Sequence, residues 1–267
     1  MQIKPLKIGN VTVKNNLFFA PLAGFSDPPM RKICSISGAG LTFTEMVSAK
    51  GLKYTPSASK ELLYCYDDSE VKAVQIFGSD PEIMGFIASS KYLKDFDIID
   101  INMGCPVPKI YNNGEGSALL NDINLASKII KAVKKSQKAV TVKFRIGAFE
   151  NKLITKDFAK MCEDSGADLI TIHGRVRTKY YQGEVNYFEI ESAKSAVKIP
   201  VIANGGVFTK SDADTLMDRT GADGIMIARG ALENPLIFSE ILGKNCKYSL
   251  AELIKIQTNL LKYKRIY

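Results

Sequence analysis

The sequence has little that could bind a metal ion or form a disulfide framework. It contains one histidine, His173, and five scattered cysteines without C-x-x-C spacing. An odd number of thiols without paired spacing argues against both a structural zinc site and a disulfide scaffold. We therefore expect reduced thiols, no bound metal, and chemistry that depends on an organic cofactor.

Long apolar segments are also missing. No stretch approaches the roughly 18 uninterrupted apolar residues of a membrane-spanning helix, and residues 1–16 lack the apolar block of a signal peptide. These absences predict a cytoplasmic protein that does not interact with a membrane. The 46% of hydrophobic and 24% of charged residues are typical of a globular domain, and 267 residues can form one large α/β domain.

The charge is unbalanced toward the positive side. The 36 Lys and Arg residues outnumber the 28 Asp and Glu residues, which gives a net charge of +8. Such an excess favours a polyanionic partner, because phosphate contacts release counterions. A lysine-rich surface also serves solubility, so charge alone leaves open whether the partner is a nucleic acid.

Eight short apolar runs rich in β-forming residues alternate with amphipathic stretches. This alternation predicts parallel strands joined by helices, and eight is the strand number of a (βα)8 TIM barrel of about 250 residues. Asn121-Asp122 and Ser211-Asp212 are typical helix starts between the runs. A doubly wound sheet is the competing α/β arrangement, but no G-x-G-x-x-G follows the first run. The runs are Leu17–Pro21, Leu41–Met46, Val71–Phe77, Phe96–Asn102, Ala139–Arg145, Asp168–His173, Ile199–Asn204 and Asp223–Ala228.

The character of the chain changes after Arg229. Asn234-Pro235 predicts a short helix up to Leu242, and Ser249 begins a run with apolar residues at helical spacing, which ends in the basic segment at residues 262–265. A single helix cannot bury its own apolar face, so it must dock on the barrel or belong to a helical domain. We therefore expect a barrel domain at residues 1–243 and, at residues 244–267, the start of a helical domain that the chain does not complete.

One thiol occupies a position that suits chemistry. Cys105 follows an apolar run within Asn102-Met103-Gly104-Cys105-Pro106, and the loops at the C-terminal ends of barrel strands carry the active site. Gly104 and Pro106 restrict the backbone on either side of it. A cysteine is commonly a small buried hydrophobe, but this position favours a catalytic thiol.

Other predicted strands end in residues that suit a flat heterocycle. The small residues at 20–24 let a ring approach the backbone, Gln75 offers an amide, and an inward Lys143 would require an anionic or accepting partner. The only imidazole, His173, ends the sixth run. A satisfied buried Gln75, an outward Lys143 and a core His173 remain the alternatives.

Two glycine-rich segments suit a phosphate group. Asn204-Gly205-Gly206 follows the seventh run and Ala228-Arg229-Gly230 follows the eighth. TIM barrels commonly bind a phosphate with these two loops. FMN fits the whole set of strand ends, because it combines one phosphate with a flat ring and polar ring edges.

Together these segments resemble the bacterial tRNA-dihydrouridine synthase family, most of all the branch that contains the B-type enzymes. The resemblance runs from about residue 10 to residue 242. It is carried by Ala20–Asp27, Gly38–Leu41 with Glu45-Met46, Val74–Pro81, Asp100–Pro106, Gly116–Leu120, Thr171–Arg175 and Ile202–Gly205.

The resemblance implies an FMN-dependent reduction of a uridine in tRNA to 5,6-dihydrouridine, with NADPH as the electron donor. Cys105 would be the proton donor, Asn102 would face the target base, and Arg175 and Arg177 would lie where RNA approaches. We expect a monomer that acts on tRNA. The implied FMN-binding residues are Pro21, Leu22, Ala23, Gln75, Lys143, His173, Asn204, Gly205, Gly206, Ala228 and Arg229.

The sequence departs from the family pattern at two positions. Gly206 stands where the family often has Asp, and Ala228 where it often has Gly; both changes should preserve phosphate binding by the backbone. The family carries a helical tRNA-binding domain, so an incomplete one predicts weak tRNA binding. An FMN barrel that reduces a free pyrimidine or enone, or an RNA-binding relic without turnover, remains the alternative.

Overall fold

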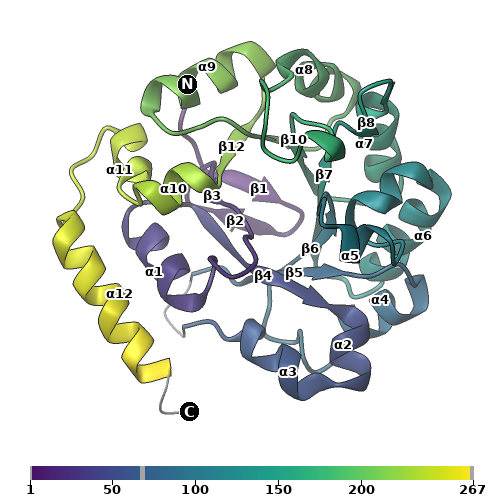
Figure 1. The fold of residues 1–267 in the computed structure, drawn as a ribbon, viewed down its shortest axis with the longest axis horizontal. Helices are drawn as coiled ribbons and strands as arrows, with labels where there is room; N and C mark the ends of the chain where they lie inside the picture. The colour runs from purple at the N-terminus through teal and green to yellow at the C-terminus, as the bar shows by residue number, and fades with distance from the viewer. Residues whose placement is uncertain (1, 67–69, 265–267) are drawn as a thin grey trace.

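The computed structural model describes residues 2–66 and 70–264, and its centre is a closed barrel of eight parallel strands (Figure 1). The strands follow one another around the barrel in chain order, and the last pairs with the first. Each of the eight apolar runs overlaps one of them, and β4 and β6 extend one or two residues beyond their runs, so the predicted TIM barrel is confirmed. The strands are β3 (Leu17–Phe19), β4 (Leu41–Ser48), β5 (Ala73–Phe77), β6 (Ile98–Met103), β7 (Ala139–Arg145), β10 (Leu169–His173), β11 (Val201–Asn204) and β12 (Gly224–Ile227).

Helices surround the barrel and connect its strands (Figure 1). The α-helices are α1 (Pro28–Ile36), α2 (Ala49–Tyr54), α3 (Pro56–Lys60), α4 (Pro81–Ala88), α5 (Pro108–Tyr111), α6 (Ile123–Lys134), α7 (Thr155–Asp164), α8 (Tyr187–Ala196), α9 (Lys210–Thr220), α10 (Arg229–Glu233), α11 (Ile237–Leu242) and α12 (Leu250–Lys264). Short 3-10 turns are η1 (Glu61–Leu63), η2 (Gly116–Asn121) and η3 (Arg177–Lys179).

The helix starts were predicted with mixed success. The Asp122 side chain accepts the Leu125 N–H at 2.9 Å and begins α6 as expected. The prediction for α9 was wrong, because Thr209, two residues before Ser211, is the N-cap: its hydroxyl accepts the Asp212 N–H while the Asp212 carboxylate accepts the Thr209 N–H. This reciprocal capping box satisfies two backbone donors and fixes the start at Lys210.

The predicted helix start at Asn234-Pro235 was also wrong, because no helix begins at these residues. Arg229–Glu233 already forms α10, and α11 begins only at Ile237. The Asn234 side chain accepts the Leu236 N–H at 3.0 Å and so forms the turn between the two helices. An asparagine that bonds the backbone two residues ahead favours a turn over a helix interior.

Two antiparallel hairpins were not predicted. They are β1 (Leu6–Ile8) with β2 (Val11–Val13), and β8 (Gly147–Phe149) with β9 (Lys152–Leu153). Their strands have at most three residues, which is too short for a period-two pattern to be recognised. The first hairpin packs its apolar residues against the residues that fill the barrel interior.

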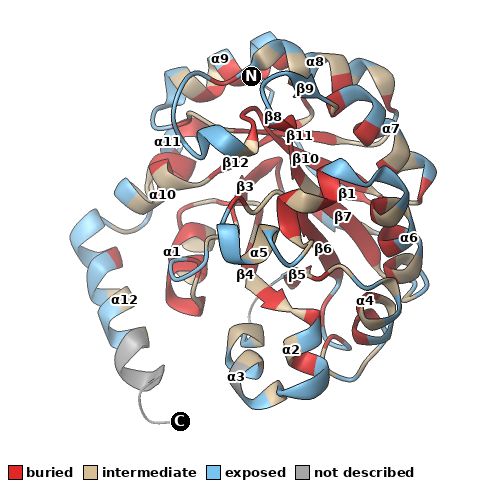
Figure 2. Ribbon diagram, turned by 45° about the vertical axis from the view of Figure 1, so that its right-hand side comes forward, coloured by how far each residue is buried: buried red, intermediate tan, exposed pale blue. Residues whose placement is uncertain are grey.

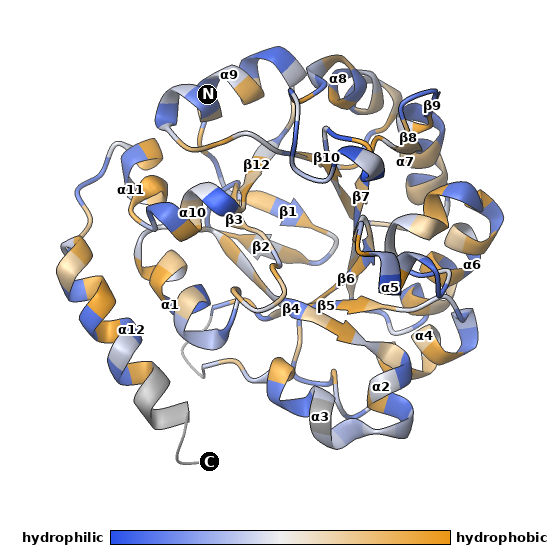
Figure 3. Ribbon diagram, in the orientation of Figure 1, coloured by the Kyte–Doolittle hydropathy of each residue, from blue (hydrophilic) through white to orange (hydrophobic). Residues whose placement is uncertain are grey.

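Apolar residues form two layers, one inside the barrel and one between the strands and the helices. The barrel strands are mostly buried and hydrophobic, whereas the surrounding helices combine buried with exposed and hydrophobic with hydrophilic residues (Figures 2 and 3). In β7, Val140, Val142 and Phe144 belong to the outer layer and Ala139 to the inner one. Because side chains alternate along a strand, the polar residues of β7 at 141, 143 and 145 face the interior. The barrel interior is therefore polar toward the C-terminal ends of the strands.

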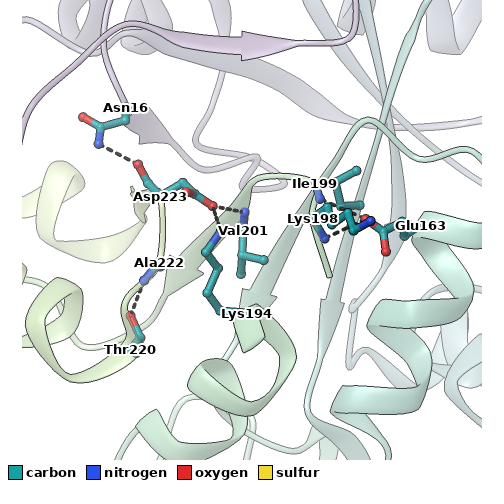
Figure 4. Close-up of polar contacts among 9 residues, drawn as sticks. All are labelled: Asn16, Glu163, Lys194, Lys198, Ile199, Val201, Thr220, Ala222 and Asp223. Carbon is teal, nitrogen blue, oxygen red and sulfur yellow. Dashed lines mark hydrogen bonds and ion pairs between the residues drawn. The ribbon is translucent and has the colours of Figure 1, made fainter. Parts of the chain in front are cut away.

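At the opposite, N-terminal end, carboxylates fix the strand starts. The Asp223 carboxylate accepts the Val201 N–H at 2.8 Å and the Lys194 ammonium at 2.7 Å, while its backbone carbonyl accepts from Asn16 at 2.6 Å (Figure 4). Glu163 accepts the N–H groups of Lys198 and Ile199 (Figure 4). Hydrogen bonds of this kind at the N-terminal end of a barrel stabilise the fold and leave the other end for chemistry.

The last helix, α12, runs beside α1 (Figure 1). Ser249 and Glu252 form its capping interactions, as the predicted start at Ser249 requires. Leu253 is fully buried, whereas Leu250 and Ile254 are exposed. The apolar stripe is thus only partly covered, and the side chains of the basic segment at residues 262–265 lie outside the described residues. None of the described helices is long and apolar enough to span a bilayer.

Candidate active site

A cavity of about 560 Å³ opens at the C-terminal end of the barrel. Its walls come from residues that end the strands or directly follow them. Of the residues predicted from the sequence, the cavity brings together Pro21, Leu22, Ala23, Gln75, Asn102, Cys105, Lys143, His173, Arg175, Asn204, Gly205, Gly206, Ala228 and Arg229. Parallel strands that end at one edge explain why positions so distant in sequence converge.

Cys105 lies on a turn that is fixed from both sides. Its N–H donates to the Asn102 side-chain oxygen at 2.9 Å, and its carbonyl accepts the Ser117 hydroxyl at 2.7 Å. Gly116 has φ +60°, and a Cβ there would lie 3.0 Å from the Cβ of Cys105. Burial raises the pKa of the Cys105 thiol above its ordinary value, so the sulfur is protonated at neutral pH.

A row of polar side chains crosses β5, β6 and β7 below the cavity. Gln75, Asp100 and Thr141 are register neighbours, and the Asp100 carboxylate accepts from Gln75 at 2.6 Å and from Thr141 at 2.5 Å. Burial raises the pKa of Asp100 to about 6, although both hydrogen bonds oppose the shift. Asn102 lines the cavity, but its amide also bonds inward, donating to Gln75 at 2.8 Å.

Cationic side chains outnumber acidic ones in the rest of the cavity: Lys143, Arg145, Arg175 and Arg229 line it, together with one carboxylate, that of Glu233. Within the described ranges, none of the four forms an ion pair with a carboxylate. Lys143 donates to the Asn204 side-chain oxygen at 3.0 Å. Uncompensated cations in one cavity favour an anionic, acceptor-rich ligand.

The same surroundings shift two further pKa values. Burial, followed by the charge of Arg145, lowers the pKa of Lys143 to about 8. Burial, followed by the charges of Arg145 and Lys143, lowers the pKa of His173 well below its ordinary value. His173 is therefore neutral at pH 7, with one ring nitrogen able to donate and the other able to accept.

The Lys143 shift predicts how the stability of the ligand-free protein depends on pH. The unfolded chain holds this proton up to near the ordinary pKa of 10.5, whereas the folded protein releases it near 8. Between these values the unfolded state binds more protons at this group, so the contribution of Lys143 to the free energy of unfolding rises with pH, by at most about 1.4 kcal/mol per pH unit. The buried thiols, whose pKa values are raised, contribute in the opposite direction, but they do so equally in wild type and in Lys143→Met. Urea unfolding from pH 8 to 10 should therefore give a slope of unfolding free energy against pH that is more positive in wild type than in Lys143→Met. Equal slopes would contradict the buried position of the ammonium.

The two glycine-rich loops after β11 and β12 touch each other. Gly205 and Gly206 have φ +130° and +72°, values that favour glycine. A Cβ on Gly230 would lie 2.2 Å from the Val207 carbonyl oxygen and 3.0 Å from Cα of Phe208. The absence of side chains therefore brings the backbones of both loops to one corner of the cavity.

Gly230→Ala is expected to separate these loops. The added methyl group should lower the free energy of unfolding by about 1–3 kcal/mol, the usual cost of overpacking, and it should weaken retention of any phosphate ligand held there. Thermal unfolding and ligand content measure the two effects. Gly221→Ala controls for a general loss of stability, because φ +60° strains an alanine there but nothing lies within 4 Å; it should keep its ligand content, and unchanged ligand content in Gly230→Ala would contradict the assignment.

The sequence did not identify Arg145 and Tyr181 as site residues. Arg145 donates to the Gly104 carbonyl at 2.8 Å and to the Tyr180 carbonyl at 2.7 Å, so it joins the Cys105 turn to the loop after β10. The centre of the Tyr181 ring lies 5.7 Å from the guanidinium group of Arg145 and 5.0 Å from that of Arg229. Alternation along β7 could have indicated Arg145, two residues after Lys143, but no sequence pattern indicates Tyr181.

The two arginines predicted to meet RNA lie in different places. Arg175 lines the cavity and donates to the Gly183 carbonyl at 3.0 Å. Arg177 does not line it; its guanidinium lies 3.6 Å from the Tyr111 ring centre, and its buried Nε has no hydrogen-bond partner within the described chain. Only Arg175 is therefore brought to the cavity.

The fold and the cavity define a TIM-barrel protein with its candidate site at the C-terminal ends of the strands. Morphinone reductase is a similar solved structure, with a TM-score of 0.65 and 14% identity over 93% of this chain and 91% of that one. Histamine dehydrogenase from Rhizobium sp. 4-9 has a TM-score of 0.67 and 16% identity over 90% of this chain but 47% of its own. Identities this low show the fold alone.

Sequence comparison narrows the class. The family model described as dihydrouridine synthase matches residues 18–264. The chain is 41% identical over 234 residues to tRNA-dihydrouridine synthase B of Pasteurella multocida, covering 87% of this chain and 70% of the relative. It is 40% identical over 237 residues to tRNA-dihydrouridine synthase B of Vibrio parahaemolyticus, covering 88% and 74%. The chain belongs to the dihydrouridine synthase family, as its motifs predicted.

Proposed function

We propose that this protein is a flavin-dependent enzyme that reduces a uridine in tRNA to 5,6-dihydrouridine. Its family and the names of its relatives support this activity. The observation that carries the proposal is a protonated thiol, Cys105, held at the wall of a cationic cavity in a chain of this family.

The residues around the cavity fit FMN. The touching loops at Gly205, Gly206 and Arg229 would hold its phosphate, since backbone N–H groups and a guanidinium suit an anion. Lys143 and His173 would face the polar ring edge with Gln75 and Asn204, while Pro21, Leu22, Ala23 and Ala228 would line the ring. Bound FMN, with NADPH as donor, would supply the hydride for C6 of the base.

Cys105 would supply the second hydrogen. Its Sγ holds a proton at neutral pH because burial raises the thiol pKa, so it would act as a general acid toward C5 of the base. The hydrogen bonds of the Cys105 N–H and carbonyl groups, which fix the turn, would keep the sulfur in place during the transfer. A thiolate could not perform this step.

The substrate would enter from the open end of the cavity. A base reaches such a site only after it leaves its stack. Asn102 would face that base, while Arg175, at the cavity, and Arg177, outside it, would meet the RNA backbone, consistent with the net charge of +8. We further propose a cytoplasmic monomer in which residues 1–243 are catalytic and the helix beyond residue 244 belongs to a tRNA-binding part.

The visible spectrum of the purified protein, followed by an assay on unmodified tRNA, tests the proposal. Oxidised-flavin absorption, NADPH oxidation and dihydrouridine formation are expected together. A yellow protein that reduces free pyrimidines or enones but leaves tRNA unchanged would contradict the substrate. A colourless protein that only binds RNA would contradict the enzymatic activity.

A further inference from the structure

We infer that Asp100 is a positioning residue: its carboxylate sets the orientation of two amide side chains, and through them it fixes the turn that carries Cys105. The inference rests on the proposed function, because it assigns the turn to proton transfer. It concerns a residue that does not line the cavity and that would touch neither cofactor nor base.

The arrangement begins with three neighbouring strands. Gln75 of β5 and Thr141 of β7 flank Asp100 of β6 in register. Asp100 is fully buried; one carboxylate oxygen accepts the Thr141 hydroxyl at 2.5 Å and the other accepts Gln75 Nε2 at 2.6 Å. Both bonds run within one layer of the barrel interior.

The acceptor at Asp100 determines which end of each amide side chain donates and which end accepts. An ionised carboxylate only accepts hydrogen bonds, so Gln75 must turn its NH₂ group toward Asp100 and its oxygen away. That oxygen accepts Asn102 Nδ2 at 2.8 Å. Asn102 is thereby oriented with its own oxygen toward the turn, where it accepts two N–H groups, of Gly104 at 3.1 Å and of Cys105 at 2.9 Å.

Without the fixed acceptor, Gln75 would no longer be held in one orientation, and Asn102 would keep its orientation only through the two backbone N–H groups that it accepts. The two ends of an amide have nearly the same shape, so either orientation fits the same space. A reversed Asn102 would place its NH₂ group against the N–H groups of Gly104 and Cys105, and the turn would lose both bonds. A displacement of about 1 Å in a reacting group can lower a rate about 10²-fold.

Packing does not explain the choice of an aspartate here. No described cation forms an ion pair with Asp100, and burial raises its pKa to about 6. A well-packed apolar residue commonly serves a barrel interior at least as well as a buried charge. The carboxylate therefore contributes something other than packing: its charge attracts that of the buried Lys143, and its oxygens fix the orientation of the amides.

Three substitutions separate orientation from charge. Asp100→Leu removes the acceptor and keeps the number of side-chain heavy atoms, and we expect kcat for dihydrouridine formation to fall about 10²-fold, with FMN content and flavin reduction by NADPH retained. Asp100→Asn should stay within a few-fold of wild type, because its oxygen can still accept from Gln75 while the Thr141 hydroxyl accepts its NH₂ group. Thr141→Val, on the other side of the carboxylate, is the matched control and should also stay near wild type.

A second readout follows the turn itself. Iodoacetamide labelling, followed at the Cys105 peptide by mass spectrometry, should be faster in Asp100→Leu than in wild type, although turnover is slower. Wild-type kcat and labelling in Asp100→Leu would overturn the inference. If that variant does not fold, a 10²-fold loss in Asp100→Asn would overturn it instead, since charge rather than orientation would then be required. A wild-type protein that forms no dihydrouridine would contradict the proposed function, while the labelling rates would still test the positioning role.

Discussion

Replacement of Cys105 by alanine is expected to lower dihydrouridine formation by about 10²- to 10⁴-fold, the usual contribution of a general acid. Flavin content and flavin reduction by NADPH should remain, because neither requires a proton from this thiol. Steady-state assays measure dihydrouridine formation, and anaerobic stopped-flow experiments measure the reduction of the flavin by NADPH separately. The prediction depends on the protonated sulfur at the cavity wall.

Cys162→Ala is the matched control. Cys162 is fully buried in α7 and does not line the cavity. Its removal should lower stability through a small void and leave turnover per folded protein unchanged. Equal turnover in Cys105→Ala and wild type would remove Cys105 from the mechanism.

Lys143→Met is expected to weaken FMN binding. The stability of the ligand-free protein should stay the same or rise. A hydrogen bond from a charged donor contributes about 1.5–3 kcal/mol, so the dissociation constant should rise roughly ten- to a hundredfold. The ligand-free protein no longer buries an ammonium without an ion-pair partner among the described residues. Flavin titration and thermal unfolding measure the two effects.

Lys194→Met should give the reverse result. Lys194 pairs with Asp223 at 2.7 Å at the N-terminal end of the barrel, away from the cavity. Its loss should lower stability and leave FMN affinity unchanged. Unchanged FMN affinity in Lys143→Met as well would mean that Lys143 does not face the cofactor.

The barrel was predictable because each of its strands lies in a separate run that is rich in apolar, β-forming residues. Strands of a parallel barrel are buried on both faces, and this leaves a strong signal even in β12, which has four residues. The short hairpins gave no such signal. The start of α9 was misplaced because Thr209, Ser211 and Asp212 are all acceptable caps, and only the reciprocal Thr209 and Asp212 bonds select one.

The cavity lining was predictable for a related reason: parallel strands end at one edge, so residues that end strands must meet. The contacts between them were not predictable. Nothing local indicates that Gln75 donates to Asp100, that Tyr181 lies near two arginines, or that Arg177 stacks on Tyr111. These depend on loop paths and on which side chain occupies the neighbouring strand.

Dihydrouridine formation on tRNA that lacks the modification is the most direct measurement of the central claim. The purified protein with FMN and NADPH should convert uridine to dihydrouridine in such tRNA, with one NADPH consumed per product, and Cys105→Ala should reduce NADPH oxidation and product formation together. A flavin-loaded wild-type protein that oxidises NADPH but leaves every uridine of that tRNA unchanged would contradict it.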